Sequence, residues 1–251
     1  AYARQQFDIG AVEYVNSFFF EKATDTAYLN ELKLRSSDAG VNNVLIMIDK
    51  EGPLADPYAA VRNKAVENHY KWIEAAAHLG CHAVRVNAYY SNGSYQDTGK
   101  AFVESMNKLG EFAATEKITV LMENHGGFSS NGYWIREVFE QLDSERFGTL
   151  PDFGNFTINR EEGLMFDPLA GLSFMMPFAK GVSAKAHNFD AEGNETTIDF
   201  PRMMQIVKAA GFSGYTGIEW GGNGYQPRLT ADEGIMATKK LLQKLGAGLP
   251  A

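Results

Sequence analysis

The feature that most constrains the fold of this chain is a repeated alternation of short apolar runs and longer helical patterns. Seven runs have the length and composition of strands, at residues 11–16, 43–49, 82–87, 118–124, 148–152, 181–187 and 215–220. Helical patterns follow them at residues 24–39, 57–79, 97–116, 131–143, 167–179, 199–210 and 230–246. Several runs, such as VLIMI at 44–48, are apolar throughout. This is typical of parallel strands that helices cover on both faces, so an α/β protein with a parallel sheet is predicted.

Helix boundaries support this reading. Asp97, Asp167 and Asp199 stand where helix N-caps are wanted, because a carboxylate there accepts a hydrogen bond from a free backbone N–H. Gly80 stands where a helix ends and the backbone turns left-handed. No linker or low-complexity tract interrupts the pattern, which predicts a single domain over residues 1–251.

The length of 251 residues is ordinary for one (β/α)8 barrel, which needs eight strands. Only seven strand patterns are present, and the opening AYARQQF resembles the end of a helix. We therefore expect that a first strand and most of its helix lie outside this chain. An open seven-stranded sheet is the competing interpretation, although it leaves an unpaired edge beside residues 11–16.

Composition narrows the function. The 31 acidic and 23 basic residues give a net charge of −8, which argues against a surface that follows nucleic-acid backbones. No run approaches about 18 apolar residues, so no membrane partner is expected. One cysteine, Cys81, excludes an internal disulfide framework. No signal peptide is visible, and both a cytoplasmic and a periplasmic location agree with the sequence, as does a homo-oligomer.

Four of the strand patterns end on side chains that bind metals or transfer protons. They end at Glu123, at Asp152, at Lys185 with His187, and at Glu219. The carboxyl ends of parallel barrel strands meet at one mouth, where active sites lie. Three carboxylates there would repel one another and lose solvation unless a cation lay among them. The pattern predicts a metal-dependent enzyme.

The expected cofactor is one divalent ion, because oxygen ligands with one imidazole suit Mn²⁺ best, with Mg²⁺, Co²⁺ or Zn²⁺ as alternatives. Further polar side chains at the mouth are candidates for contacts with a substrate: Glu13, Asn87, His125 and Asn155. Each residue alone has a structural explanation, such as a helix cap or a loop anchor, and the prediction rests on their joint position at strand ends.

The segments ENHGGFSSNG, LPDFGNF, MPFAKGVSAKAHNFD and GFSGYTGIEW together resemble the sugar phosphate isomerase/epimerase group of the xylose isomerase-like barrels. The resemblance implies that Glu123, Asp152, His187 and Glu219 bind one metal, and that the two glutamates form the acid/base pair. Two features depart from the group. Asn155 stands where many members carry histidine, and Ser183, Lys185 and His187 replace a common His-x-His-x-Lys pattern.

The predicted activity is isomerisation or epimerisation of a small sugar or keto-sugar. One glutamate would remove a carbon-bound proton, the metal and Lys185 would stabilise the enediolate, and the other glutamate would return the proton. Two alternatives stay open. The same residues would serve a lyase or hydratase acting on a 3-keto-sugar or keto-glycoside, or a barrel that binds sugar without turnover. A multi-zinc nuclease is disfavoured, because only His125 and His187 lie near the expected mouth.

Overall fold

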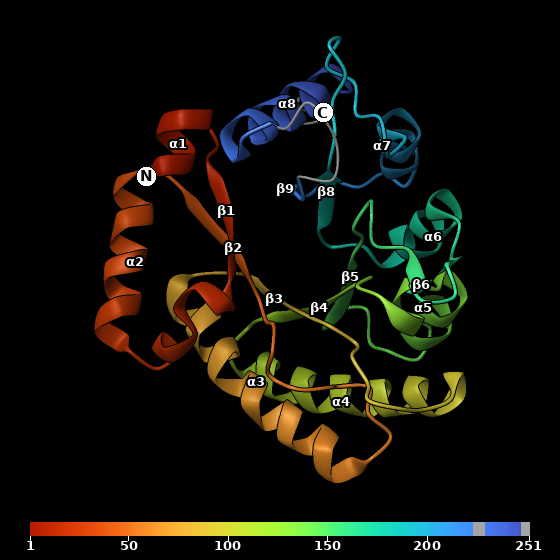
Figure 1. Cartoon of the computed structure of the whole chain (residues 1–251). Helices are drawn as coiled ribbons and strands as arrows, with labels where there is room; N and C mark the ends of the chain where they lie inside the picture. Colours follow the sequence, from red (N-terminus) through yellow and green to blue (C-terminus); the bar gives the residue numbers. More distant parts are fainter. Residues whose placement is uncertain (223–228, 247–251) are drawn as a thin grey trace.

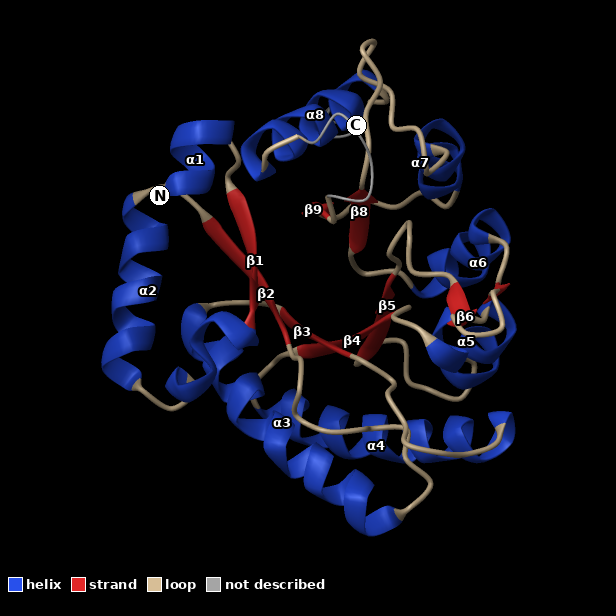
Figure 2. Cartoon of the chain, viewed as in Figure 1, coloured by secondary structure: helices blue, strands red, loops and turns tan. Residues whose placement is uncertain are grey.

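The structure is a computed structural model that describes residues 1–222 and 229–246, and in these residues parallel strands form an inner ring surrounded by helices (Figures 1 and 2). The ring strands are β1 (Ala11–Val15), β2 (Asn42–Met47), β3 (Ala83–Val86), β4 (Thr119–Glu123), β5 (Phe147–Leu150), β8 (Val182–Ala186) and β9 (Thr216–Trp220). The helices are α1 (Tyr2–Phe7), α2 (Thr26–Asp38), α3 (Ala59–Leu79), α4 (Tyr95–Thr115), α5 (Gly132–Phe139), α6 (Pro168–Met175), α7 (Phe200–Ala209) and α8 (Ala231–Lys244).

Short elements complete the connections. Three 3₁₀ helices follow β1, β4 and α6: η1 (Asn16–Lys22), η2 (Gly127–Ser130) and η3 (Met176–Phe178). A small antiparallel hairpin of β6 (Thr157–Asn159) and β7 (Leu164–Met165) follows β5, and the sequence patterns did not predict it. None of the described helices has the length and apolar character needed to cross a membrane.

The period of two along each strand separates two layers of the core. Ile46, Val84 and Val120 face outward and pack against the surrounding helices. Leu45 and Leu121 belong to a second cluster inside the ring. The side chain two positions after Leu121 is Glu123, which therefore continues the inward face at the carboxyl end of β4. The same alternation directs the active-site candidates of other strands into the mouth.

The helix starts are mostly as expected. Asp167 and Asp199 are N-caps whose carboxylates accept hydrogen bonds from backbone N–H groups of α6 and α7. The prediction for Asp97 was wrong, because α4 begins earlier and its N-cap is Ser94. Ser94 Oγ accepts a hydrogen bond from the backbone N–H of Asp97, whose carboxylate lies in the first helical turn. Gly80 ends α3 with a φ of 79°, a left-handed conformation that glycine adopts without strain.

The ring is an α/β barrel with a seam. Strands β1 to β5 form one continuous parallel sheet, and β8 pairs with β9. An isolated bridge between Asp152 and Ser183 connects the sheet to β8, and another joins Thr149 of β5 to Ala179, which precedes β8. In residues 1–222 and 229–246, β1 and β9 do not pair with each other. The seven strands and the seam agree with the strand count expected from the sequence.

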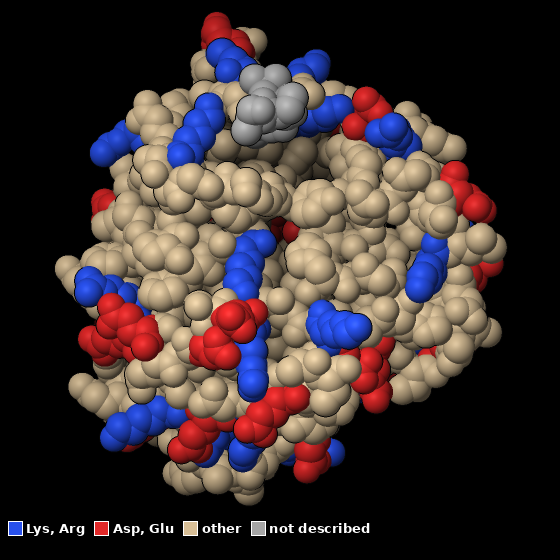
Figure 3. Space-filling view, turned by 180° about the vertical axis from the view of Figure 1, so that it is seen from behind, with Lys and Arg blue, Asp and Glu red and all other residues tan. Residues whose placement is uncertain are grey.

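Charged side chains of both signs are mixed around the face in Figure 3.

Candidate active site

Three carboxylates gather at the carboxyl ends of the strands, as the sequence predicted. Glu123 ends β4, Asp152 follows β5, and Glu219 lies near the end of β9. One oxygen from each lies within 4.8 Å of the others. Glu123 and Asp152 are 1% and 0% exposed, whereas the Glu219 side chain is 39% exposed. The cluster therefore contains two buried carboxylates and one that is partly exposed.

Strand β8 supplies both a cation and a hydroxyl to this cluster. Lys185 Nζ lies 2.8 Å from Glu219 Oε1 and 3.5 Å from Asp152 Oδ2. Ser183 Oγ lies 2.9 Å from Asp152 Oδ2 and 3.0 Å from Glu219 Oε2, so the hydroxyl bridges the two acids. Ser183 and Lys185 are two positions apart and therefore share the inward face of β8. Sequence reasoning assigned Lys185 to the site but gave Ser183 no role.

Two amides fix the loop that carries Asp152. Asn155 Nδ2 donates to Glu123 Oε1 at 3.0 Å, and Asn155 Oδ1 accepts from Lys185 Nζ at 3.1 Å. Asn124 is fully buried and exchanges hydrogen bonds with the backbone N–H and carbonyl of Asp152. Asn155, a predicted substrate contact, thus also orients the Glu123 and Lys185 side chains.

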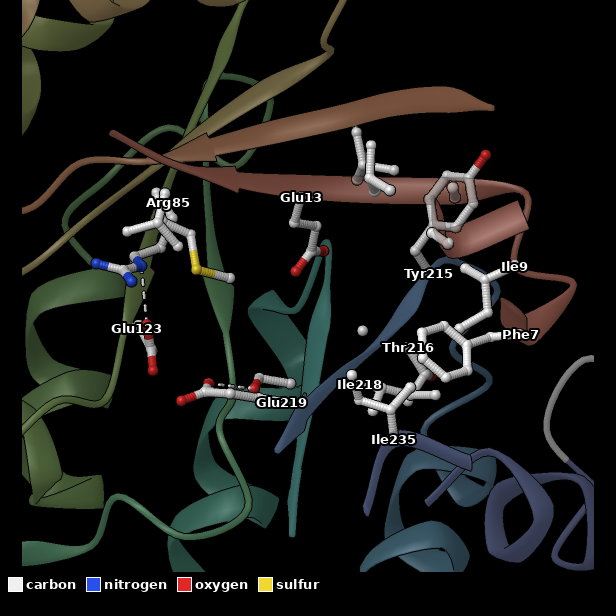
Figure 4. A pocket seen from close by; sticks show the side chains of 18 of the residues that line it. Phe7, Ile9, Glu13, Arg85, Glu123, Tyr215, Thr216, Ile218, Glu219 and Ile235 are labelled. Carbon is white, nitrogen blue, oxygen red and sulfur yellow. Dashed lines mark hydrogen bonds and ion pairs between the residues drawn. The ribbon is translucent and has the colours of Figure 1, made fainter. Parts of the chain in front are cut away.

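A second cation, Arg85 of β3, was not assigned from the sequence. Its Nη1 donates to Asp49 Oδ1 at 2.8 Å, and its Nε lies 2.8 Å from Glu123 Oε2 in an ion pair (Figure 4). The geometry of that second contact does not satisfy a hydrogen bond, so Glu123 Oε2 is buried without a hydrogen-bond donor from the part of the chain that the structure describes. Asn87, a predicted substrate contact, donates to Asp49 Oδ1 at 2.9 Å. A charged residue at an inward position of the apolar run AVRV was the available signal for Arg85.

Glu13 lies on the inward side of β1 and borders a cavity of about 920 Å³ at the seam (Figure 4). Arg85, Glu123 and Glu219 line the same cavity, and apolar residues such as Ile218 line its other end. Gly217 of β9 permits this arrangement, because a Cβ there would lie 2.7 Å from Glu13 Oε2. Burial, reinforced by the charge of Glu123, raises the pKa of Glu13 to about 7.

Burial and neighbouring charges move the pKa values of the three clustered acids in different directions. Burial raises the pKa of Glu123 despite the nearby Arg85, and it holds the pKa of Asp152 well above its usual value despite Lys185. For Glu219, burial is outweighed by the charge and hydrogen bond of Lys185, and its pKa is lowered. Burial therefore favours the neutral forms of Glu123 and Asp152, whereas Lys185 favours the ionised form of Glu219.

The two histidines of the prediction lie beside the carboxylates. His125 Nδ1 hydrogen-bonds with the Tyr89 hydroxyl at 2.7 Å, and His125 borders the seam cavity. His187, predicted as a metal ligand, is not in the carboxylate group of the described residues. It follows the end of β8, where a Cβ on Gly221 would lie 2.6 Å from its ring. His125 and His187 both line a second recess of about 610 Å³, together with Lys185 and Glu219.

Solved structures share this fold. The chain is similar to a xylose isomerase domain protein from Planctomyces limnophilus at 14% identity and a TM-score of 0.73, covering 96% of this chain and 89% of that one. It is similar to a 3-keto-D-glucoside 4-epimerase from E. coli at 17% identity and 0.66, covering 88% and 84%. It is also similar to a xylose isomerase-like TIM barrel protein from Mycobacterium smegmatis in complex with magnesium at 15% and 0.68, covering 98% and 88%.

No curated protein sequence matches the chain. The family model for xylose isomerase-like TIM barrels matches residues 3–241, which is nearly the whole chain. This match confirms the predicted barrel and the predicted resemblance to xylose isomerase-like barrels. The chain belongs to the xylose isomerase-like TIM barrel family.

Proposed function

We propose that this protein is a divalent-metal-dependent isomerase or epimerase of a small sugar or keto-sugar. The observation that carries the proposal is the cluster of Glu123, Asp152 and Glu219 within 4.8 Å at the barrel mouth. The sugar epimerases among proteins of the same fold, such as the E. coli enzyme that acts on a 3-keto-glucoside, support this class of substrate.

The clustered side chains fit a hard divalent ion. One oxygen of each of the three carboxylates lies within 4.8 Å of the others, close enough for these oxygens to contact one ion. Glu123 Oε2 accepts no hydrogen bond from the described residues, although Arg85 Nε lies 2.8 Å away, so its lone pairs are available to a metal ion. Glu123, Asp152 and Glu219 would hold the ion, and His187 would join them only after its ring turned inward. Carboxylate oxygens favour Mn²⁺, Mg²⁺ or Co²⁺ over Zn²⁺. A bound ion would act as a Lewis acid on the substrate's carbonyl group.

The protein's own groups divide the proton transfers. Glu123 and Glu219 would form the acid/base pair, in which one carboxylate takes a carbon-bound proton and the other returns a proton, because both lie in the carboxylate cluster at the mouth. The Lys185 ammonium stabilises negative charge on the substrate oxygen that faces β8. Asn155 positions Glu123 and Lys185 through its two hydrogen bonds.

The remaining predicted contacts line the space around the reacting groups. Glu13 is placed to accept a hydrogen bond from a sugar hydroxyl at the seam cavity, since its Oε1 has no hydrogen-bond partner among residues 1–222 and 229–246. His125 borders the same cavity and the recess, and its ring faces the Tyr89 hydroxyl. Asn87 Oδ1 also has no hydrogen-bond partner, and its amide nitrogen is held by Asp49.

The test is exchange of solvent deuterium into a panel of ketohexoses and 3-keto-glucosides, with Mn²⁺ added. We expect exchange at the carbon beside the carbonyl group, and a product that differs in mass from the substrate only by the incorporated deuterium. Glu123→Gln should lower turnover by at least about a hundredfold, because it removes one member of the acid/base pair. Glu74→Gln, an exposed change on α3, serves as the matched control. Loss or gain of water would instead identify the lyase or hydratase reaction. No exchange with any compound, or full activity of Glu123→Gln, would contradict the proposal.

A further inference from the structure

Each of the six oxygens in the carboxylate cluster already has a contact within the protein. Asn155 and Arg85 contact the two oxygens of Glu123. The backbone N–H of Gly154 and the Ser183 hydroxyl contact those of Asp152. On Glu219, Lys185 contacts Oε1 and Ser183 contacts Oε2. A carboxylate oxygen can keep a hydrogen bond while it binds a metal, but the positive charges of Arg85 and Lys185 oppose a divalent ion bound to the same carboxylates.

We infer that Lys185 is a resident cation that competes with the metal: its ammonium neutralises Asp152 and Glu219 in the metal-free protein and leaves them when the ion binds. The inference rests on the proposed function, because it requires the three carboxylates to form the metal site. It assigns to Lys185 a role in metal affinity that is separate from contact with substrate.

Geometry singles out Lys185 among the groups that contact the cluster. Arg85 is held on both sides, by Asp49 and by Glu123, and its side chain is 5% exposed. Lys185 contacts the cluster through the end of a flexible stem, and its side chain is 11% exposed. A divalent ion bound to Glu219 and Asp152 would lie within a few ångströms of the Lys185 nitrogen, where two positive charges repel strongly.

Asn155 and a neighbouring recess can accommodate the Lys185 ammonium after it leaves the carboxylates. Asn155 Oδ1 already accepts a hydrogen bond from Lys185 Nζ at 3.1 Å. Beyond it lies the recess of about 610 Å³, which Lys185 itself lines with His187 and Thr157. Gly154 leaves room for this movement, because a side chain there would meet the Lys185 stem at 3.1 Å. Binding of the metal would therefore turn the ammonium toward the space where substrate is expected.

The experiment is isothermal titration of the metal-free protein with Mn²⁺, comparing the unsubstituted chain with Lys185→Met. We expect the variant to bind Mn²⁺ at least tenfold more tightly, because the competing charge is gone. Lys180→Met, which removes a lysine whose ammonium donates to the backbone carbonyl of Glu145, should bind within twofold of the unsubstituted chain. Without metal, Lys185→Met should unfold at a lower temperature than the unsubstituted chain, and saturating Mn²⁺ should narrow the difference.

The outcomes separate the inference from the proposed function. Equal or weaker Mn²⁺ binding by Lys185→Met would overturn the inference alone. No binding of Mn²⁺, Mg²⁺ or Co²⁺ by any of the three chains would overturn the proposed metal site and the inference with it. Trace acetylation of the unsubstituted chain gives a test that needs no variant. Lys185 should react several-fold faster once Mn²⁺ is bound, with Lys180 unchanged, and equal or slower reaction at Lys185 would also overturn the inference.

Discussion

The two sides of the barrel mouth use the same components in different ways. On the side of β2 to β4, Arg85 lies between Asp49 and Glu123. On the side of β8 and β9, Lys185 lies between Asp152 and Glu219. Each side therefore has two carboxylates and one cation.

The difference lies in how firmly the cation is held. The planar guanidinium of Arg85 is buried and pairs with Asp49, which follows β2, and with Glu123, which ends β4, and its charge is permanent. Lys185 presents one nitrogen at the edge of an open recess. The comparison indicates that the arginine side is a fixed scaffold that orients Glu123, whereas the lysine side can exchange its cation.

Removing the fixed cation should have the largest effect. Arg85→Met leaves the buried carboxylate of Glu123 without a counter-charge, and breaking a buried pair in this way costs about 3–5 kcal/mol of the free energy of unfolding. Arg35→Met, which breaks an exposed pair with Glu31, should cost less than about 1 kcal/mol. Urea denaturation of both variants measures the difference. Similar small losses for the two would show that Arg85 is not a structural cation.

The sequence predicted the three clustered carboxylates of the mouth better than it predicted the Arg85–Asp49 pair. Apolar strand patterns end at Glu123, Asp152 and Glu219. The alternation of side chains along a strand, together with the barrel topology, is enough to predict that the side chains at these strand ends meet. Arg85 and Asp49 depend on pairing across β2 and β3, whose register a single sequence does not reveal. The family resemblance named His187 as a ligand, but the pleat of β8 turns Ser183 and Lys185 toward the acids and leaves His187 beyond the strand end.

The sequence predicted the seam only through the number of strand patterns, and not its position in the structure. Seven strand patterns indicated that one strand position would be open, which the unpaired edges of β1 and β9 agree with in the described residues. The count gave no location for Glu13 relative to β9. Its closeness to Gly217 follows from the curvature of the closed ring, a tertiary property that local patterns do not encode.

Glu13 offers a pH-dependent test of the seam side. Its pKa rises from 4.5 to about 7 on folding, so its contribution to stability is complete below pH 4.5 and is lost as the pH rises through 7. Glutamine has no such dependence. Between pH 4.5 and 8 the free energy of unfolding of Glu13→Gln, relative to the unsubstituted chain, should therefore increase by up to about 3 kcal/mol. Urea denaturation in the presence of a chelator measures it. A difference for Glu13→Gln that stays constant with pH would refute the raised pKa.

Substitution of Ser183 should have the smallest effect, and it tests the side of the mouth formed by β8 and β9. Its hydroxyl carries one proton but contacts both Asp152 and Glu219, so it can donate to one of them at a time. Ser183→Ala should lower the free energy of unfolding of the metal-free protein by about 1.5–2 kcal/mol, the size of one hydrogen bond to a charged group. Ser173→Ala, which removes an exposed hydroxyl bonded to the carbonyl of Leu169, should change it by less than about 0.5 kcal/mol. If the lysine side exchanges its cation, saturating Mn²⁺ should reduce the loss in Ser183→Ala, because the ion then balances the two acids that the hydroxyl bridges. A loss that is the same with and without Mn²⁺ would mean that Ser183 holds the strand ends together rather than the charges, and that both sides of the mouth are fixed.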